Sequence, residues 1–453
     1  MIFYLMAFSL VSVPWLRGGY FSWVPWLLGI TSLASLSLTA FSAISVVGFR
    51  KNNPAFSKYW FAWFLLVVLL VVSLLNPSFR TVQLGEGFLL SKLDHYEWLP
   101  SVVSVDRSFS KITTFLSILV LGWCLHAQQF SGRQLRRLLL ICSINALLLA
   151  LIGTFYDLAG VEAPLGVFKE VNPSFFASFT YHNHWVAFAG VNLFIASYLS
   201  VHVARTRRGD RNDANRFAAF IALCFFLFLS LLVVESRAGV LVAFLYVLCV
   251  LWTVGLRKLV PILRSVGQPG LKRRWTAPVA ITGLLIILGA SAIVISESQL
   301  ETVSEKYGDA WLGLWDSDPK VNDFRFDQGP KIALELIKDR PIWGWGWGSY
   351  YYAMKQYAPL YIDDKATAQY AHNDWLQFFS ELGAAGFLLL VLPICLQAFR
   401  YFKSGGKLNW LHTGLGVVLL LALFEFPLSN SAVLLHCMIV LVSTWQSGKT
   451  RVS

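Results

Sequence analysis

Residues 217–256 read FAAFIALCFFLFLSLLVVESRAGVLVAFLYVLCVLWTVGL, and this stretch decides the class of fold. Two apolar runs are separated only by Glu235, Ser236 and Arg237. A helix that crosses a bilayer needs roughly 20 apolar residues. Two such runs joined by so short a connection predict a pair of antiparallel transmembrane helices.

The composition extends this prediction to the whole chain. Of its 453 residues, 56% are hydrophobic, 15% aromatic and 14% charged, whereas about a quarter of the residues are charged in soluble domains. This balance excludes a soluble enzyme, a disordered chain and a fibrous protein, and it predicts an integral membrane protein.

Twelve apolar segments have a length close to that of a membrane span. The first has no basic residue before it and is followed by Arg17, so we interpret it as a retained helix rather than a signal peptide. The prediction is an all-α fold of about 12 transmembrane helices, with residues 1–453 forming a single polytopic domain. The segments are 2–16, 24–49, 59–75, 112–127, 138–158, 185–204, 217–234, 238–256, 277–295, 375–399, 410–426 and 429–445.

The charges predict the orientation. If both termini lie inside, the inside loops hold 22 of the 37 Lys and Arg residues but only two of the 25 acidic residues, Asp210 and Asp213. Such an asymmetry is expected from the positive-inside rule, so the net charge of +12 indicates topology rather than nucleic-acid binding. The longest outside loop, residues 296–374, lies between the ninth and tenth spans and is expected to contain short helices.

The six cysteines all lie inside apolar segments, and none has a CxxC partner. They are predicted to be small buried side chains rather than disulfides or metal ligands.

Two places at span ends could carry chemistry. Arg237 lies at the outside membrane surface, where it could take part in a reaction. The alternative is that its side chain only contacts lipid headgroups. His372 precedes Asn373 and Asp374, either of which can cap the following helix. Further along that helix, the spacing of Gly383 and Gly386 favours close helix packing.

Between them, residues 331–338 form a short amphipathic pattern that Pro341 ends. The sequence WGWGWG follows at residues 343–348. We expect a tight turn anchored in the interface by indoles, and the alternative is a platform on which a sugar stacks.

Two other clusters resemble metal sites weakly. His182 and His184 flank Asn183, but no carboxylate or Cys follows at ligand spacing, which favours an interfacial pair. Asp363 and Asp364, together with Asp374, look more like an exposed loop face than a cation site.

Three features in order resemble the O-antigen ligase and O-antigen polymerase superfamily. They are the arginine in the short loop at Arg237, a stretch with Arg325 followed by PxxGxGxGxY at residues 341–350, and HN-x9-G-x2-G from His372 to Gly386. The resemblance implies a GT-C-like membrane glycosyltransferase of the bacterial inner membrane, active on the periplasmic face. It further implies that the donor is a glycan on undecaprenyl diphosphate, that the acceptor is lipid A core or another glycan, and that no cofactor or metal takes part.

Matched residue by residue, Arg237, Arg325 and His372 correspond to the functional Arg, Arg and His of that superfamily. The stretch SFTYHNHW also resembles its Asn-containing start of an earlier span, at Asn183. Candidate substrate-binding residues are Arg237, Arg325, Asn373, Asn183, Arg340 and Lys331, the last two because they lie near Arg325 in the same loop.

The residue types suit this chemistry. A guanidinium can grip diphosphate oxygens bidentately, and a neutral His can accept the proton of an attacking hydroxyl near pH 7. His372 is therefore a candidate base, or else a hydrogen-bond donor to the diphosphate. The motifs do not separate ligase from polymerase.

Other classes are less well supported. A transporter would need charges deep inside its spans or broken helices, and a scaffold protein would give no reason for Arg and His to converge on one face. A peptidoglycan polymerase would use an acidic residue.

Overall fold

The computed structural model describes residues 1–45, 58–84, 87–161, 163–166, 175–206, 211–234, 236–256, 328–357 and 369–447. Its contacts divide the chain into two compact units, Met1–Leu245 with Gln328–Ser453, and Tyr246–Asp327. The site described below belongs wholly to the first unit. The predicted ninth span, residues 277–295, and Arg325 lie outside the described residues.

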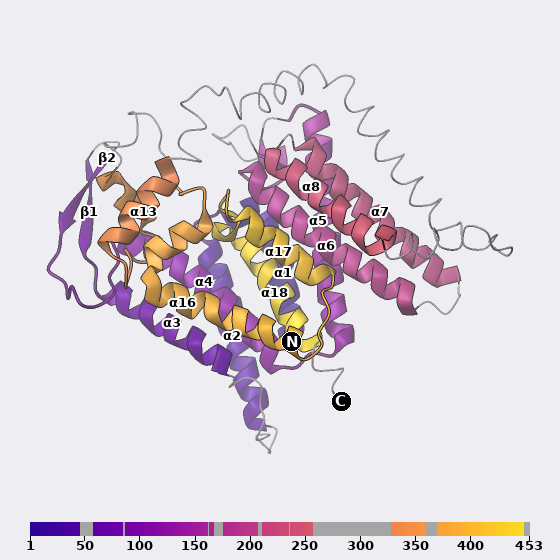
Figure 1. The fold of residues 1–453 in the computed structure, drawn as a ribbon, viewed down its shortest axis with the longest axis horizontal. Coiled ribbons are helices and arrows are strands. Elements are labelled where there is room, and N and C mark those ends of the chain that lie inside the picture. Colours follow the sequence, from indigo (N-terminus) through magenta and orange to yellow (C-terminus); the bar gives the residue numbers. More distant parts are fainter. Residues whose placement is uncertain are drawn as a thin grey trace. The chain divides into compact units, whose positions relative to one another are not determined.

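Helices account for eleven of the twelve predicted segments, and Figure 1 shows their arrangement. Six are long and apolar enough to cross a membrane, and five shorter apolar helices accompany them. The number of spans remains a prediction. The helices are α1 (Ile2–Trp15), α2 (Val24–Ser45), α3 (Lys58–Leu75), α4 (Val105–Ala127), α5 (Gly132–Leu158), α6 (His182–Thr206), α7 (Arg211–Val233), α8 (Arg237–Val250), α16 (Asp374–Lys403), α17 (Trp410–Leu421) and α18 (Ser431–Ser447).

Short elements complete the described part of the chain. The loop predicted at residues 296–374 contains α13 (Gly329–Asp339) and α14 (Tyr350–Ala353). An antiparallel hairpin is formed by the strands β1 (Phe79–Leu84) and β2 (Gly87–Lys92). The all-α prediction did not include it. Single 3-10 turns are η1 (Arg17–Gly19), η3 (Pro164–Gly166), η8 (Met354–Gln356) and η9 (Pro427–Ser429). A π-helical segment, η4 (Leu251–Leu256), directly follows α8.

Helix α6 is the core of the first unit. Every side chain from Asn183 to Ser197 is buried, and α6 contacts α5, α7, α17 and α18. A helix that is buried on all sides lies inside a bundle rather than at its surface. The start of α6, at His182, is therefore fixed by the helices around it.

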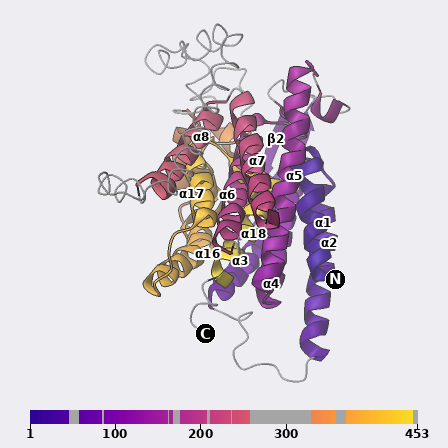
Figure 2. The same cartoon turned by 90° about the vertical axis from the view of Figure 1, so that its right-hand side faces the viewer.

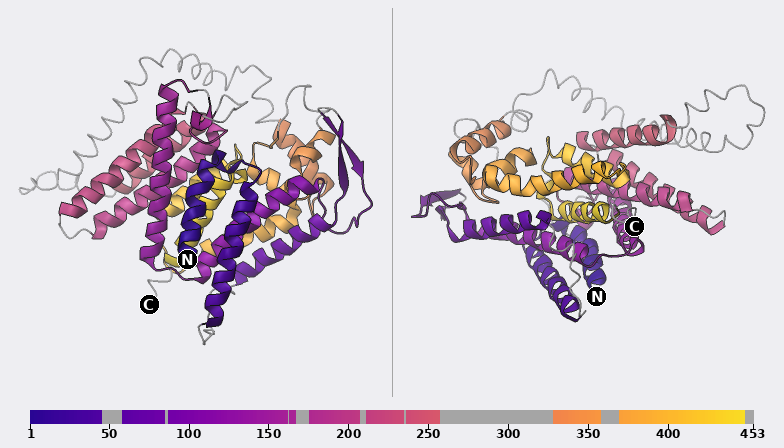
Figure 3. Two further views of the ribbon diagram at one scale, coloured as in Figure 1. Left: turned by 180° about the vertical axis from the view of Figure 1, so that it is seen from behind. Right: turned by 60° about the horizontal axis from the view of Figure 1, so that its bottom comes forward.

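Outer helices instead show apolar residues to their surroundings. On α3, which lies beside α16 (Figure 3), Phe61 and Phe64 are about 60% exposed. Exposing these apolar side chains to water would be unfavourable, whereas exposing them to lipid would not. This pattern agrees with a helix at the lipid boundary.

Helix α1 lies against α2 and α5 (Figure 2), joined by a polar contact at Asn145. Pro14 lacks the amide hydrogen that would bond the carbonyl of Leu10. The amide of Asn145 donates to that carbonyl at 3.3 Å, and the indole of Trp15 donates to Asn145 Oδ1 at 2.7 Å. The proline inside α1 thus leaves no unsatisfied carbonyl at Leu10.

The cysteines are all free. Cys124, Cys142, Cys224 and Cys437 are buried, as predicted, but Cys249 is half-buried and Cys395 is exposed on α16. The prediction of burial is wrong for Cys395 because an outer helix in a membrane can turn an apolar side chain away from the protein.

Candidate active site

The site is built around the turn between α17 and α18. Helix α17 ends at Leu421, and Asp374 on α16 holds the residues that follow. Its amide donates to the carbonyls of Ala422 at 2.9 Å and Glu425 at 3.3 Å. Its carboxylate Oδ2 accepts from the amide of Leu428 at 2.7 Å. Asp374 is fully buried, so it fixes this turn from inside the protein.

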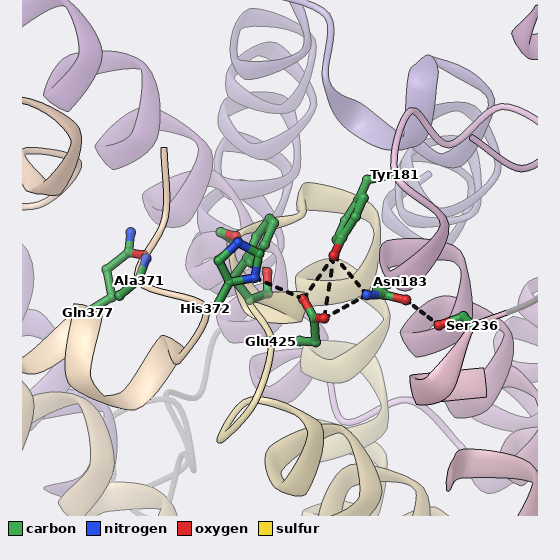
Figure 4. A network of polar contacts seen from close by, with 9 residues as sticks. Tyr181, Asn183, Ser236, Ala371, His372, Gln377 and Glu425 are labelled. Atoms are coloured by element: carbon green, nitrogen blue, oxygen red, sulfur yellow. Dashed lines mark hydrogen bonds and ion pairs between the residues drawn. The ribbon is translucent and has the colours of Figure 1, made fainter. Parts of the chain in front are cut away.

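The turn presents Glu425 to His372. Nδ1 of His372 lies 3.4 Å from Oε2 of Glu425, and the two side chains are only 15% and 13% exposed. The same carboxylate accepts from Asn183 Nδ2 at 2.7 Å and from the hydroxyl of Tyr181 at 3.2 Å (Figure 4). Three segments far apart in the sequence therefore meet at one carboxylate.

The network continues to the start of α8. Asn183 Oδ1 accepts a hydrogen bond from the hydroxyl of Ser236, and Figure 4 shows Ser236 at the far end of the network from His372. Arg237, an exposed residue, follows Ser236 directly and begins α8. Arg237 is thus tied through its neighbour to the His372–Glu425 pair.

His372 is held by its backbone as well as by Glu425. Its φ is 50°, a left-handed conformation that non-glycine residues adopt only where surrounding structure supports it. The ring meets Phe426 edge-on at 4.9 Å. Phe426 in turn stacks on Tyr181 and Tyr370, with ring planes within 5° and 7° of parallel.

The next residue, Asn373, caps α16. Its side-chain oxygen accepts from the amide of Leu376 at 3.0 Å, so of the two residues expected as caps it is Asn373 that serves. Within the predicted set, the structure brings together His372, Asn373 and Asn183, and connects Arg237 to them.

Arg340 and Lys331 have other surroundings. Arg340 donates to the hydroxyl of Ser101 at 2.9 Å and lies 4.1 Å above the ring of Trp345. Burial lowers the pKa of the Arg340 guanidinium, and the charges of Asp339 and Glu97 partly oppose this. Lys331 lies exposed on α13. Arg340 therefore packs the loop.

The WGWGWG stretch forms the expected tight turn. Gly344, Gly346 and Gly348 all have positive φ, at 69°, 92° and 82°. However, Trp345 and Trp347 are buried rather than anchored in the interface. The indole of Trp345 donates to the carbonyl of Leu336 at 2.9 Å, which also excludes Trp345 as a sugar platform.

This turn binds to a break in α16. At Gly383 the backbone leaves the helical conformation, with φ 61° and ψ −176°. The amides of Trp345 and Gly346 donate to the carbonyls of Ser380 and Glu381 at 2.9 and 2.8 Å. The expectation that Gly383 serves close packing of helices is wrong, because it serves a turn–helix junction.

Sequence reasoning missed Glu425 and Tyr181. Glu425 lies inside the predicted span 410–426, so the sequence analysis gave it no separate role. The one available signal was Pro427, because the residue before a proline disfavours the helical conformation and a helix ending earlier would have left Glu425 in a loop.

Comparison with known families gives a match to part of the chain. Residues 222–391 match the family model described as O-antigen ligase. The match supports the O-antigen ligase superfamily for this region of the chain. Members of this superfamily are glycosyltransferase-like ligases and polymerases. The match and the apolar helices together indicate a multi-pass membrane protein. No curated protein matched the chain.

The O-antigen ligase match covers only part of the site. It includes Arg237, Arg325 and His372, while Asn183 and Glu425 lie outside it. Asn183 and Glu425, which bind each other between His372 and Arg237, are therefore supplied by helix α6 and by the turn after α17, which the family match does not reach.

Proposed function

We propose that the chain moves a glycan from undecaprenyl diphosphate to a hydroxyl of lipid A core or another glycan, on the periplasmic face of the bacterial inner membrane. The observation that carries the proposal is the His372–Glu425 pair, half-enclosed and joined through Asn183 and Ser236 to the start of α8 at Arg237. A base and a guanidinium tied into one network are the groups that this transfer needs.

The pair gives His372 its role. A tautomer with its hydrogen on Nδ1, the atom 3.4 Å from Glu425 Oε2, leaves Nε2 with a lone pair. Nε2 then takes the proton of the acceptor hydroxyl while that oxygen bonds to the anomeric carbon. The bond from this carbon to the diphosphate oxygen breaks, and undecaprenyl diphosphate leaves with the electron pair. Glu425 stabilises the imidazolium that forms, as a buried carboxylate does for other catalytic histidines.

The arginines would meet the leaving group. Charge develops on the diphosphate as the bond breaks, and a planar guanidinium binds two of its oxygens at once. Arg237 lies at the exposed end of the network, where a lipid headgroup can reach it. We assign Arg325 the same task from the resemblance, with Asn373, Arg340 and Lys331 kept as substrate-binding candidates.

We propose the same topology as the sequence predicts, a single polytopic domain over residues 1–453 with residues 296–374 on the periplasmic side. Helices α13 and α14 fall inside that range, which supports a loop with short helices of its own. No cofactor is assigned.

The test is transfer by purified protein in lipid nanodiscs with an undecaprenyl-diphosphate-linked glycan. His372→Ala should lower turnover at least 100-fold, with donor binding within about twofold of wild type. His95→Ala is the matched control, because His95 is another half-buried histidine, placed in the loop before α4. Near wild-type turnover of His372→Ala would refute the base, and loss of donor binding would instead place His372 on the diphosphate.

A polymerase of the same superfamily is the second candidate, because it shares donor and chemistry. Supplying lipid A core or a second lipid-linked glycan as the only acceptor distinguishes the two reactions. A transporter would move a glycan without forming a bond, so covalent product excludes it.

A further inference from the structure

A cavity of about 280 Å³ lies beside the site, between α4, the turn after η1, the WGWGWG stretch and the residues before α18. This volume is near the lower end for ligand pockets, which suits a small polar group rather than a polyprenyl chain. Its walls are rich in aromatic rings. They include Tyr20, Phe21, Trp347, Tyr351, Tyr370 and Phe378.

Two cations on one face of α4 also line the cavity, Arg107 and Lys111. Lys111 Nζ lies 3.3 Å from the carbonyl of Ser429 and 3.5 Å from the hydroxyl of Tyr370. The guanidinium of Arg107 lies 4.6 Å from the ring centre of Tyr351. Among the described residues, neither cation forms an ion pair with a carboxylate.

The one acid in the lining, Glu381, forms no ion pair with either cation, although the charges of Lys111 and Arg107 act on it. Glu381 is buried, and its two oxygens accept from the amides of Gly348 at 2.9 Å and Tyr350 at 3.1 Å. Its charge is already used to hold the WGWGWG turn. Two half-buried cations beside one carboxylate leave an excess of positive charge in the cavity, which favours a bound anion because their desolvation is otherwise only partly compensated.

The cavity reaches the site from the side opposite to Arg237. Tyr370 lines it and stands two residues before His372, so the two lie within roughly 7 Å along the backbone. Gln377, another lining residue, accepts from the amide of Ala371 at 3.1 Å. Figure 4 shows Gln377 on one side of His372 and Ser236 on the other.

We propose that this cavity binds an acidic sugar residue of the acceptor glycan, with its carboxylate or phosphate on Arg107 and Lys111. Aromatic rings offer faces for the C–H side of a sugar ring, while cations bind its anionic group through charge-assisted hydrogen bonds. The inference rests on the proposed function, which places the donor at Arg237 and leaves the Tyr370 side of His372 for the acceptor.

Direct binding to the purified full chain tests the site without any transfer assay. The probes are cellobiose, cellobiouronic acid and cellobiose 6-phosphate, titrated by calorimetry. At least one acidic probe should bind ten or more times more tightly than cellobiose. Lys111→Gln and Arg107→Gln should each lower the ratio of the affinity for that acidic probe to the affinity for cellobiose about tenfold. Lys92→Gln is the control, because Lys92 is an exposed cation on β2.

The outcomes separate the two proposals. No preference for either acidic probe, or a preference unchanged in both variants, would overturn the acidic-sugar site even in an active transferase. Both variants losing undecaprenyl diphosphate binding while keeping the acidic-sugar preference would also overturn it. A site that binds the acidic probe in a chain that forms no glycosidic product would overturn the proposed function alone.

Discussion

Replacing Gly383 with alanine should open the junction between α16 and the WGWGWG turn. A Cβ at this position would lie 2.3 Å from the carbonyl oxygen of Ile342 and 2.5 Å from the amide nitrogen of Gly344. Both neighbours are backbone atoms, so neither can rotate away. The backbone conformation, φ 61° and ψ −176°, is moreover one that essentially only glycine adopts.

The magnitude follows from two contributions. The backbone strain alone costs about 1–3 kcal/mol. Moving the turn away from the added methyl group would also weaken hydrogen bonds across the junction, such as Ala384 to Pro341 at 2.8 Å and Ala385 to Ile342 at 3.1 Å. Each is worth about 1 kcal/mol, so we expect a total near 4 kcal/mol.

The assay is hydrogen exchange, because it reports local opening rather than global unfolding. About 4 kcal/mol corresponds to roughly 1,000-fold faster exchange of the amides of Trp345 and Gly346. Gly405→Ala is the matched control, because Gly405 also has positive φ, 81°, but nothing lies within 4 Å of its added Cβ. Exchange at Trp345 unchanged by Gly383→Ala would refute this account of the junction.

Further predictions concern the site and the topology. Glu425→Gln keeps the shape but removes the charge beside His372, so transfer should fall about 10- to 100-fold; single-turnover rates at wild-type level would contradict the pairing. Arg237→Lys keeps the charge and loses the planar fork, so kcat should stay well below that of wild type, and full activity would show that charge alone suffices. Transfer should survive excess chelator, because arginines are assigned the positive charge that Mg²⁺ supplies elsewhere; activity lost to chelator and restored by Mg²⁺ would revive a metal site. Cysteine at Ser317 should label from the periplasm and cysteine at Ser404 should not, and the reverse pattern would invert the topology.

The apolar runs located the helices because bilayer thickness sets a minimum length that composition reveals directly. Their ends were less accurate. Helix α4 begins at Val105 rather than at residue 112, because its first turns carry Asp106, Arg107 and Lys111. A search for apolar runs discards such residues, yet in the folded protein two of them line the cavity.

The site was only partly predictable for a related reason. His372 was found through its spacing from Gly383, a local pattern along the chain. Glu425 has no such pattern, since its partners Asn183 and His372 lie 242 and 53 residues away in the sequence. Only tertiary structure brings them together.

The three residues that open α16 show how a short motif can organise a site. His372 turns in a left-handed conformation, Asn373 caps the helix, and Asp374 reaches the other way to hold the turn that carries Glu425. The position of His372 and that of its carboxylate partner are thus both set from the first turn of one helix. Asp374 is fully buried and acts on the pair through hydrogen bonds of its amide and its carboxylate to the backbone of the turn. Adjacent residues in this motif therefore have different roles, and the buried Asp374 holds the turn that brings Glu425 to His372.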